Sequence, residues 1–323
     1  IENTPYVIEH YKENLDGTYK LVETENKDGK TDTVVDAISK TYVGFTFDEE
    51  NENNILSGKI LSNGSLKLKV YYSRNTYKLK LTPTENISGV VNGGTISDEA
   101  LEKTYKYEEE VTIGATLKRV EGYNTSWKNW TSSNTELLKD VATSTATIKM
   151  PAGDIELTAN ATIMKANFPY EVRYFYDGIE DESARETGNV AEFESQVISY
   201  TEKVKDGYIF DKAENLPLTI SATSSENIIE IYYKLIDYTI TYVLQEGTLE
   251  EGIINLSQYN LKTEDFTLKA PVKERYIFTG WTGGIVDENG EIIEEGSIKT
   301  PTKNVTITKG SMGNRKYIAN WEE

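Results

Sequence analysis

His10 is the only histidine in this chain of 323 residues, and cysteine is absent. The absence of cysteine excludes disulfide frameworks, thiol nucleophiles and cysteine-ligated zinc sites. A serine or threonine nucleophile needs a base beside it, and His10 is the one side chain suited to that work near neutral pH. It lies in the stretch Tyr6-Val7-Ile8-Glu9-His10-Tyr11. Its chemistry depends on whether that stretch is a unique motif or one copy of a repeat.

Carboxylates are the most abundant reactive groups, with 53 Asp and Glu against 34 Lys and Arg and a formal charge of −19. Paired carboxylates can hydrolyse glycosides, but none lies in a segment typical of an enzyme cleft, so we predict no catalytic residue. The stretch 48–54 (DEENENN) is rich in oxygen ligands yet lacks the glycine of a calcium loop. Its counterpart 211–215 (DKAEN) carries fewer acids. We therefore predict no metal site and leave a weak calcium site in the first copy open.

Tryptophan supplies the remaining candidate chemistry, because an exposed indole ring can stack on a sugar. Trp130 is an additional tryptophan close to Trp127. We name Trp130 and Trp127 as speculative binding residues. Internal Lys–Asn isopeptide bonds stay open as well, because lysine, asparagine and acidic residues are all abundant and the sequence specifies no pairing.

The acidic balance excludes two classes of partner. Binding to phosphate needs a cationic face, so we expect no contact with nucleic acid or with a membrane. No apolar run approaches the ~20 residues that span a bilayer, and no signal peptide precedes the first residues, which indicates a soluble piece of a longer protein. The Asn-Gly-Gly and Thr-Gly-Gly turns at 92–94 and 282–284 lack the context of a phosphate loop, so no cofactor is predicted.

The elements that must position these residues are strands, since tyrosine is over-represented (22, against 8 Phe and 4 Trp) and favours half-buried strands. Three segments recur in order at a nearly constant offset: 6–11 with 170–175, 44–48 with 207–211, and 69–72 with 230–233. His10 then corresponds to Tyr174, which cannot replace a catalytic histidine. We interpret His10 as structural.

A second repeat follows each copy of the first. Residues 77–81 correspond to 238–242, and both stretches lead to a Tyr and Trp cluster and a final alternating strand. The chain therefore reads as an A-B-A-B array with modules at 1–75, 76–165, 166–236 and 237–323. We expect each module to be a sheet of roughly four strands crossed by at most one short helix. In the A modules that helix would lie near Ile38 and Tyr42, and near Phe193, Val197 and Ile198. Connections without a Gly/Ser/Pro run predict an extended, semi-rigid array.

The last segment, 238–321, resembles the internalin-type B-repeat (Listeria–Bacteroides repeat). It carries a Tyr276-Ile277-Phe278-Thr279-Gly280-Trp281 signature and a final Ala319-Asn320-Trp321, with Arg275 where that family has glycine. The resemblance implies that Trp281 is a core residue. Residues 77–163 resemble a divergent copy, with Gly122-Tyr123 retained. The A segments are similar to the mucin-binding-protein (MucBP) repeat, through a closing strand such as Val70-Tyr71-Tyr72.

These resemblances imply four small β-grasp (ubiquitin-like) modules, an α+β, β-rich fold, in a Gram-positive cell-surface protein. They imply a non-enzymatic stalk or spacer that projects a functional head from the cell wall and is attached through regions outside this chain. The alternative is an adhesin segment that binds a host glycan or glycoprotein directly. The ligand, the head, the anchor and the oligomeric state stay open.

Overall fold

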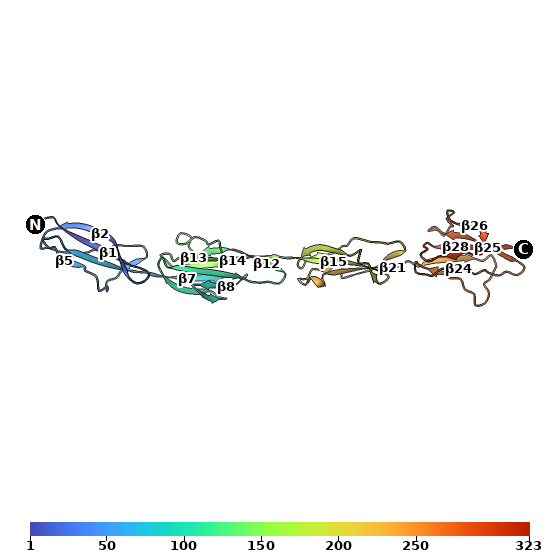
Figure 1. Cartoon of the computed structure of the whole chain (residues 1–323), viewed down its shortest axis with the longest axis horizontal. Coiled ribbons are helices and arrows are strands. Elements are labelled where there is room, and N and C mark those ends of the chain that lie inside the picture. The colour runs from blue at the N-terminus through green and yellow to red at the C-terminus, as the bar shows by residue number, and fades with distance from the viewer. The chain divides into compact units, whose positions relative to one another are not determined.

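The computed structural model describes residues 1–323, which divide into two compact units, Ile1–Ala166 and Asn167–Glu323. Each unit contains two of the predicted modules, and Figure 1 shows them in chain order from blue to red. Each predicted module holds one of four separate clusters of buried hydrophobic side chains. We keep the names A1, B1, A2 and B2 for these modules.

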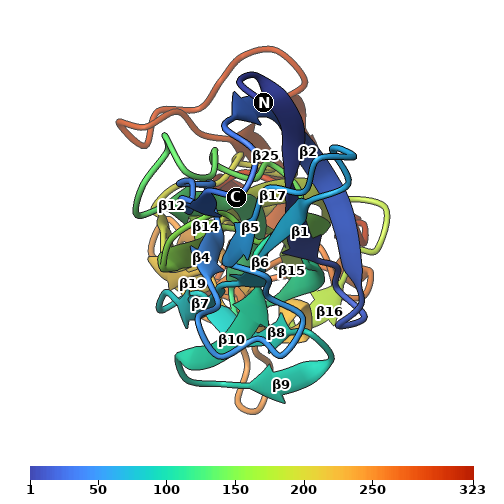
Figure 2. The same cartoon turned by 90° about the vertical axis from the view of Figure 1, so that its left-hand side faces the viewer.

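A1 is built on one four-stranded sheet in the order β2-β1-β6-β4, whose strands are labelled in Figure 2. Its strands are β1 (Thr4–Glu13), β2 (Tyr19–Gly29), β3 (Val34–Asp36), β4 (Phe45–Phe47), β5 (Ser57–Lys59) and β6 (Lys67–Arg74). The first strand, β1, runs parallel to the last, β6, and antiparallel to β2. Ile8, Leu68, Val70 and Tyr72 form the core under this sheet, which the small β3–β5 pair helps to cover.

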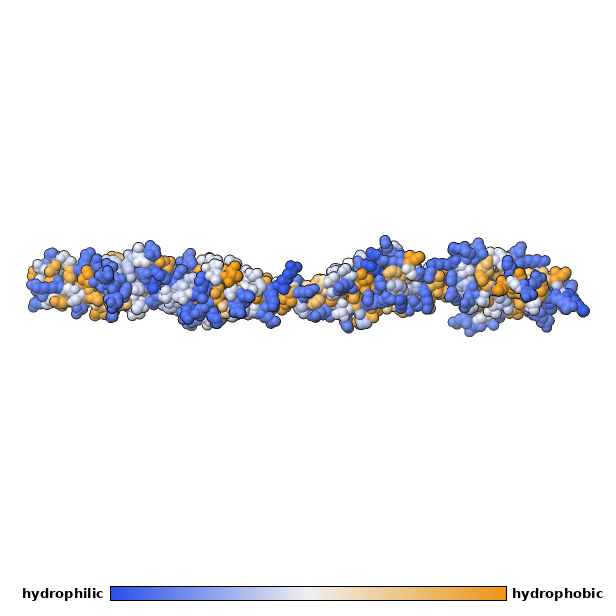
Figure 3. All heavy atoms as spheres, turned by 90° about the horizontal axis from the view of Figure 1, so that it is seen from below, coloured by the Kyte–Doolittle hydropathy of each residue, from blue (hydrophilic) through white to orange (hydrophobic).

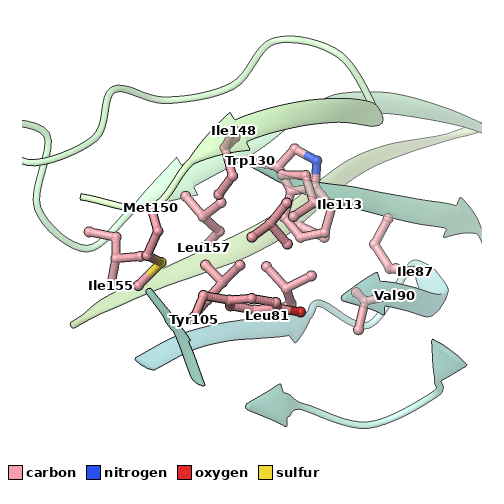
Figure 4. Close-up of a cluster of buried hydrophobic side chains, with 13 residues drawn as sticks. Leu81, Ile87, Val90, Tyr105, Ile113, Trp130, Ile148, Met150, Ile155 and Leu157 are labelled. Carbon is pink, nitrogen blue, oxygen red and sulfur yellow. The ribbon is translucent and has the colours of Figure 1, made fainter. Parts of the chain in front are cut away.

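B1 consists of two four-stranded sheets, β10-β7-β14-β12 and β13-β11-β8-β9. Its strands are β7 (Thr76–Pro83), β8 (Ile87–Asn92), β9 (Thr95–Ser97), β10 (Leu101–Lys106), β11 (Glu110–Leu117), β12 (Tyr123–Ser132), β13 (Thr145–Lys149) and β14 (Ile155–Lys165). Apolar residues alternate along these strands, as in Leu79 and Leu81, so one face of each sheet is apolar. The two apolar faces form a single core in which Trp130 and Ile113 are fully buried (Figure 4).

A2 repeats the sheet of A1, in the order β16-β15-β21-β19, with β17 also paired to β15. Its strands are β15 (Asn167–Tyr176), β16 (Ile179–Glu180), β17 (Glu186–Glu192), β18 (Gln196–Val197), β19 (Tyr208–Glu214), β20 (Leu218–Thr219) and β21 (Ile228–Leu235). The first and last strands, β15 and β21, are again parallel neighbours.

B2 has a five-stranded sheet, β23-β22-β28-β25-β26, and a separate β24–β27 pair. Its strands are β22 (Tyr238–Val243), β23 (Gln258–Tyr259), β24 (Phe266–Thr267), β25 (Ile277–Ile285), β26 (Ile298–Thr302), β27 (Thr306–Ile307) and β28 (Arg315–Glu322). Trp281 and Tyr317 lie at the centre of its core, as the signature predicts for Trp281.

The predicted α+β fold with a crossing helix is wrong. The chain contains no α-helix, only one 3-10 turn at Ser224–Glu226, so the modules are all-β and not β-grasp folds. Val35 and Ala37 pack on the A1 core, while Val34 and Ile38 are 66% and 78% exposed. That alternation is the period of a strand, and β-branched residues restrict χ1 in a helix. The counterpart in A2 is also extended, with Val197 against the core and Ile198 73% exposed.

No helix in the structure has the length and apolar character needed to cross a membrane. The surface in Figure 3 is mostly hydrophilic, with apolar residues scattered in small groups. Most exposed hydrophobic side chains are aliphatic residues without an exposed hydrophobic neighbour in the sequence, such as Val190 and Ile96.

Candidate functional site

His10 is completely buried and engaged on both ring nitrogens. Its Nε2 lies 2.8 Å from Glu25 Oε1, and its Nδ1 lies 2.9 Å from the hydroxyl oxygen of Tyr72. That hydroxyl also accepts the backbone amide of Lys40 at 2.8 Å. His10 therefore braces the A1 core and has no open side toward a substrate.

Glu25 anchors the outer end of this network. The hydrogen bond from His10, with lesser help from Lys27 and Lys40, lowers the pKa of the Glu25 carboxyl to about 2. Glu23 beside it accepts from Lys40 Nζ at 2.5 Å and from the Tyr42 hydroxyl at 2.6 Å. These bonds lower the pKa of Glu23, while burial raises the pKa of Tyr42. The cluster is a closed set of mutually satisfied groups.

In A2 the residue at the position of His10 is Tyr174, which makes different hydrogen bonds. Tyr174 is fully buried, and its hydroxyl donates to the backbone oxygen of Thr201 at 2.6 Å. Tyr233 corresponds to Tyr72, and its hydroxyl accepts the backbone amide of Lys203 at 3.0 Å. The two A modules thus have no reactive group in common at this position.

In the acidic loop of A1, residues 48–54, side-chain amides of the loop donate hydrogen bonds to Asp48. Asp48 accepts the side-chain amide of Asn51 on Oδ2 at 3.2 Å, and its backbone oxygen accepts that of Asn54 at 2.7 Å. Asn54 in turn accepts the backbone amide of Tyr71 at 3.0 Å. No group of three or more His, Cys, Asp or Glu side chains in the chain is arranged to hold a metal ion. The loop is therefore a polar turn that fixes β6.

The two fully buried asparagines bear on the open question of isopeptide bonds. Asn92 donates to the backbone oxygens of Leu79 and Leu101, at 3.0 and 3.2 Å, and accepts the Tyr105 hydroxyl at 2.8 Å. Lys103 Nζ contacts the backbone oxygens of Asn92 and Gly93 at 3.4 Å and the Thr95 hydroxyl at 3.3 Å. Asn227 likewise donates to backbone oxygens at 3.2 and 2.9 Å. Both side chains tie loops together through hydrogen bonds.

Both speculative binding tryptophans lie in B1. Trp130 is 0% exposed, and its indole N–H donates to the backbone oxygen of Ser144 at 3.3 Å (Figure 4). Trp127 is half-buried, donates to Ala142 O at 2.6 Å and packs edge-on against Trp130 at 5.6 Å between centroids. Trp130 belongs to the B1 core, and its side chain points into the space between the two sheets. It offers no face on which a sugar could stack.

All four modules share one feature that the sequence did not predict, the pairing of their first and last strands. These strands are parallel neighbours in every module: β1 with β6, β7 with β14, β15 with β21, and β22 with β28. Because parallel strands start at the same end, the chain enters each module at one end and leaves it at the other. The signal was present in the repeat itself, since the recurring tyrosine-rich segments are these terminal strands.

In each A module, two aromatic rings stack across the first and last strands. Tyr11 and Tyr71 stack at 4.7 Å with 7° between their planes, and Phe175 and Tyr232 stack at 4.8 Å with 15°. In each case one ring comes from the first strand and the other from the last. These cross-strand pairs reinforce the parallel contact.

Part of the chain matches a known family of protein domains. Residues 81–164 match the family model described as the divergent InlB B-repeat domain. This match falls on B1, the segment that resembles a divergent copy, and the resemblance of the A modules to the mucin-binding repeat stays a prediction. A comparison with curated proteins gave no match.

Among solved structures, the Bacillus anthracis TIE protein aligns with 72% of this chain at 12% identity and a TM-score of 0.30. The alignment spans about half of that protein, 51% of its chain. Two B repeat units of the collagen-binding protein Cna of Staphylococcus aureus align with 99% of this chain and 100% of theirs, at 11% identity and a TM-score of 0.16.

Proposed function

We propose that this chain is a non-enzymatic spacer segment of a bacterial cell-surface protein, which holds a functional head away from the cell wall. The observation that carries the proposal is the parallel pairing of the first and last strands in all four modules. Tension on the chain ends pulls these two strands in opposite directions along their length. Their hydrogen bonds are then loaded together in shear, so many must break at once.

Three further observations support the proposal. The match of B1 to a B-repeat domain is consistent with a repeat region of an extracellular protein. The titratable groups most nearly suited to catalysis or metal binding are engaged with one another. A formal charge of −19 keeps neighbouring chains apart at a crowded surface.

Single-molecule force spectroscopy tests this proposal on the 323-residue chain. Pulled from its two ends, the chain is expected to give four separate unfolding events at high force. A matched geometry uses Glu2→Cys and Ser62→Cys, which attach the handles just before β1 and β6, at the same end of A1. Because cysteine is absent, both handles are unique. This geometry peels the strands apart bond by bond.

We expect A1 to unfold at a severalfold lower force in the peeling geometry than in the end-to-end geometry. Equal forces in the two geometries would remove the mechanical basis of the spacer proposal. Binding of a host glycan or glycoprotein is the alternative. It would be favoured by saturable binding on a glycan array that is lost in Trp127→Ala, the tryptophan of the predicted pair that keeps an exposed part.

A further inference from the structure

The A-to-B connection is built in the same way in both units. Gly44 in A1 and Gly207 in A2 precede the penultimate sheet strand of their modules, and both have a φ of +78°. The carbonyl of Gly44 accepts the amide of Asn75, and that of Gly207 accepts the amide of Ile236, each at 2.9 Å. Asn75 and Ile236 are the first residues after the last strand of their A modules. The connection is thus tied to the sheet it leaves.

A side chain from the B module packs directly on each of these glycines. A Cβ atom on Gly44 would lie 2.0 Å from Cδ1 of Tyr107, and one on Gly207 would lie 2.2 Å from Cδ1 of Leu261. Tyr107 also meets the ring of Phe45 edge-on at 5.9 Å, and its amide donates to the backbone oxygen of Asn75 at 2.8 Å. Both glycines therefore form sockets for the following module.

An ion pair crosses each connection, and its acidic residue lies at the corresponding position of each A module. Glu13, at the end of β1, pairs with Lys106 of B1 at 2.9 Å, and Asp177, directly after β15, pairs with Lys262 of B2. The first connection has a second clamp in Arg74, which donates to Tyr107 O at 2.8 Å and to Glu108 at 2.9 Å. The Arg74 side chain is only 9% exposed, whereas the Glu108 side chain is 54% exposed, so the guanidinium lies within the connection and the carboxylate at its surface.

We propose that the A-to-B connection is a built docking interface, in which the glycine of each A module receives a side chain of the next B module and fixes its orientation. The rigid building block is then the A-B pair. This inference goes beyond the spacer proposal, because modules could resist force while swinging freely on their connections. The repeated glycine is explained by what packs on it, as well as by its own backbone conformation.

The test measures the distance between A1 and B1 in the full chain by electron paramagnetic resonance. Nitroxide labels are attached to Thr24→Cys on β2 and Asp98→Cys in B1, both exposed positions. The unmodified connection is expected to give one narrow distance distribution. Gly44→Ala places a methyl group where the Tyr107 ring lies, and we expect the distribution to become at least twofold broader.

Gly17→Ala is the matched control, because Gly17 has a φ of +85° but nothing within 4 Å of its Cβ position. It imposes the same backbone strain on A1 without touching B1. Tyr107→Ser approaches the interface from the B1 side, should Gly44→Ala unfold A1, and is also expected to broaden the distribution. An unchanged width in Tyr107→Ser, or equal broadening in Gly17→Ala and Gly44→Ala, would overturn the proposal. Neither outcome would alter the force test of the spacer.

Discussion

A1 and A2 have the same sheet arrangement and the same buried tyrosine contact, but different residues fill the core beside that tyrosine. Tyr72 and Tyr233 each accept a backbone amide, from Lys40 at 2.8 Å and Lys203 at 3.0 Å. Beside them A1 has His10 bonded to a carboxylate, whereas Tyr174 in A2 reaches a backbone oxygen. The core must satisfy each buried polar atom, but it does not prescribe which residue does so.

The comparison also separates what a histidine usually suggests from what this one does. A buried imidazole bonded to a carboxylate resembles part of a catalytic site. Here both ring nitrogens face groups of the same module and the ring is 0% exposed. The equivalent tyrosine performs the same packing role, so the arrangement is a way to tie β1 to β2 and β6.

The largest expected effect is the loss of the buried ring in A2. Tyr174→Ala is expected to lower the free energy of unfolding of A2 by about 4 kcal/mol, since it opens a cavity and leaves the Thr201 oxygen without its donor. Tyr174→Phe keeps the ring and should cost only about 1 kcal/mol. Hydrogen exchange of the β15 and β21 amides measures both values. Similar costs for the two variants would mean that packing does not dominate at this position.

The two shared tyrosines should respond unequally to loss of their hydroxyl groups. Tyr72 serves two partners, the Lys40 amide and His10 Nδ1, whereas the Tyr233 hydroxyl accepts the Lys203 amide. Tyr72→Phe is expected to cost about 2–3 kcal/mol in A1, and Tyr233→Phe about 1 kcal/mol in A2. Urea unfolding followed by hydrogen exchange in each module gives the difference. Equal costs would show that the His10 contact adds no stability.

Acid should weaken A1 through Glu25. The pKa of this carboxyl is lowered from 4.5 to about 2 in the folded module, so folding favours the ionised form. Its stabilising effect is complete above about pH 4.5 and is lost as the pH falls toward 2. Glu25→Gln should flatten the decline of A1 stability in this window. Asp181→Asn is the control, because the pKa of Asp181 is also lowered to about 2, by Lys205 in A2.

The free energy of unfolding of A1 and of A2, measured across this pH window, should respond to different variants. Glu25→Gln should change only the A1 profile, and Asp181→Asn only the A2 profile. A decline of A1 stability that persists unchanged in Glu25→Gln would assign the acid response to other groups.

The smallest expected effect concerns a position with left-handed backbone conformation that occurs in every module. Glycine occupies it in three modules, as Gly44, Gly122 and Gly207, with φ between +78° and +79°. In B2 it is occupied by Arg275, with a φ of +69°. An L-residue is strained there, so Arg275→Gly should stabilise B2 by roughly 0.5–1 kcal/mol. Arg275→Ala keeps the strain and should give no such gain. The melting temperature of B2, followed by tryptophan fluorescence, distinguishes the two variants.

Much of the local structure could be predicted from the sequence. Alternating residues in segments such as 66–71 predicted strands, and the recurrence of Tyr6–Tyr11 at Tyr170–Phe175 predicted that His10 is structural. The crossing helix was wrong because Ile38 and Tyr42 are spaced like a helical face, while Val35 and Ala37 carry the buried period of two. The sequence left open whether Trp130 is a core residue, because an extra tryptophan looks the same in sequence whether it fills a core or faces water.

The sequence by itself determined the strands, the repeat and the absence of cysteine chemistry, since these depend on residue types and on spacing within short segments. Only the tertiary structure decided that the first strand of each module lies parallel to its last, and that Tyr107 and Leu261 pack on distant glycines. Such contacts join residues tens of positions apart. Their geometry depends on how whole sheets twist and pack, which no local pattern of residues records.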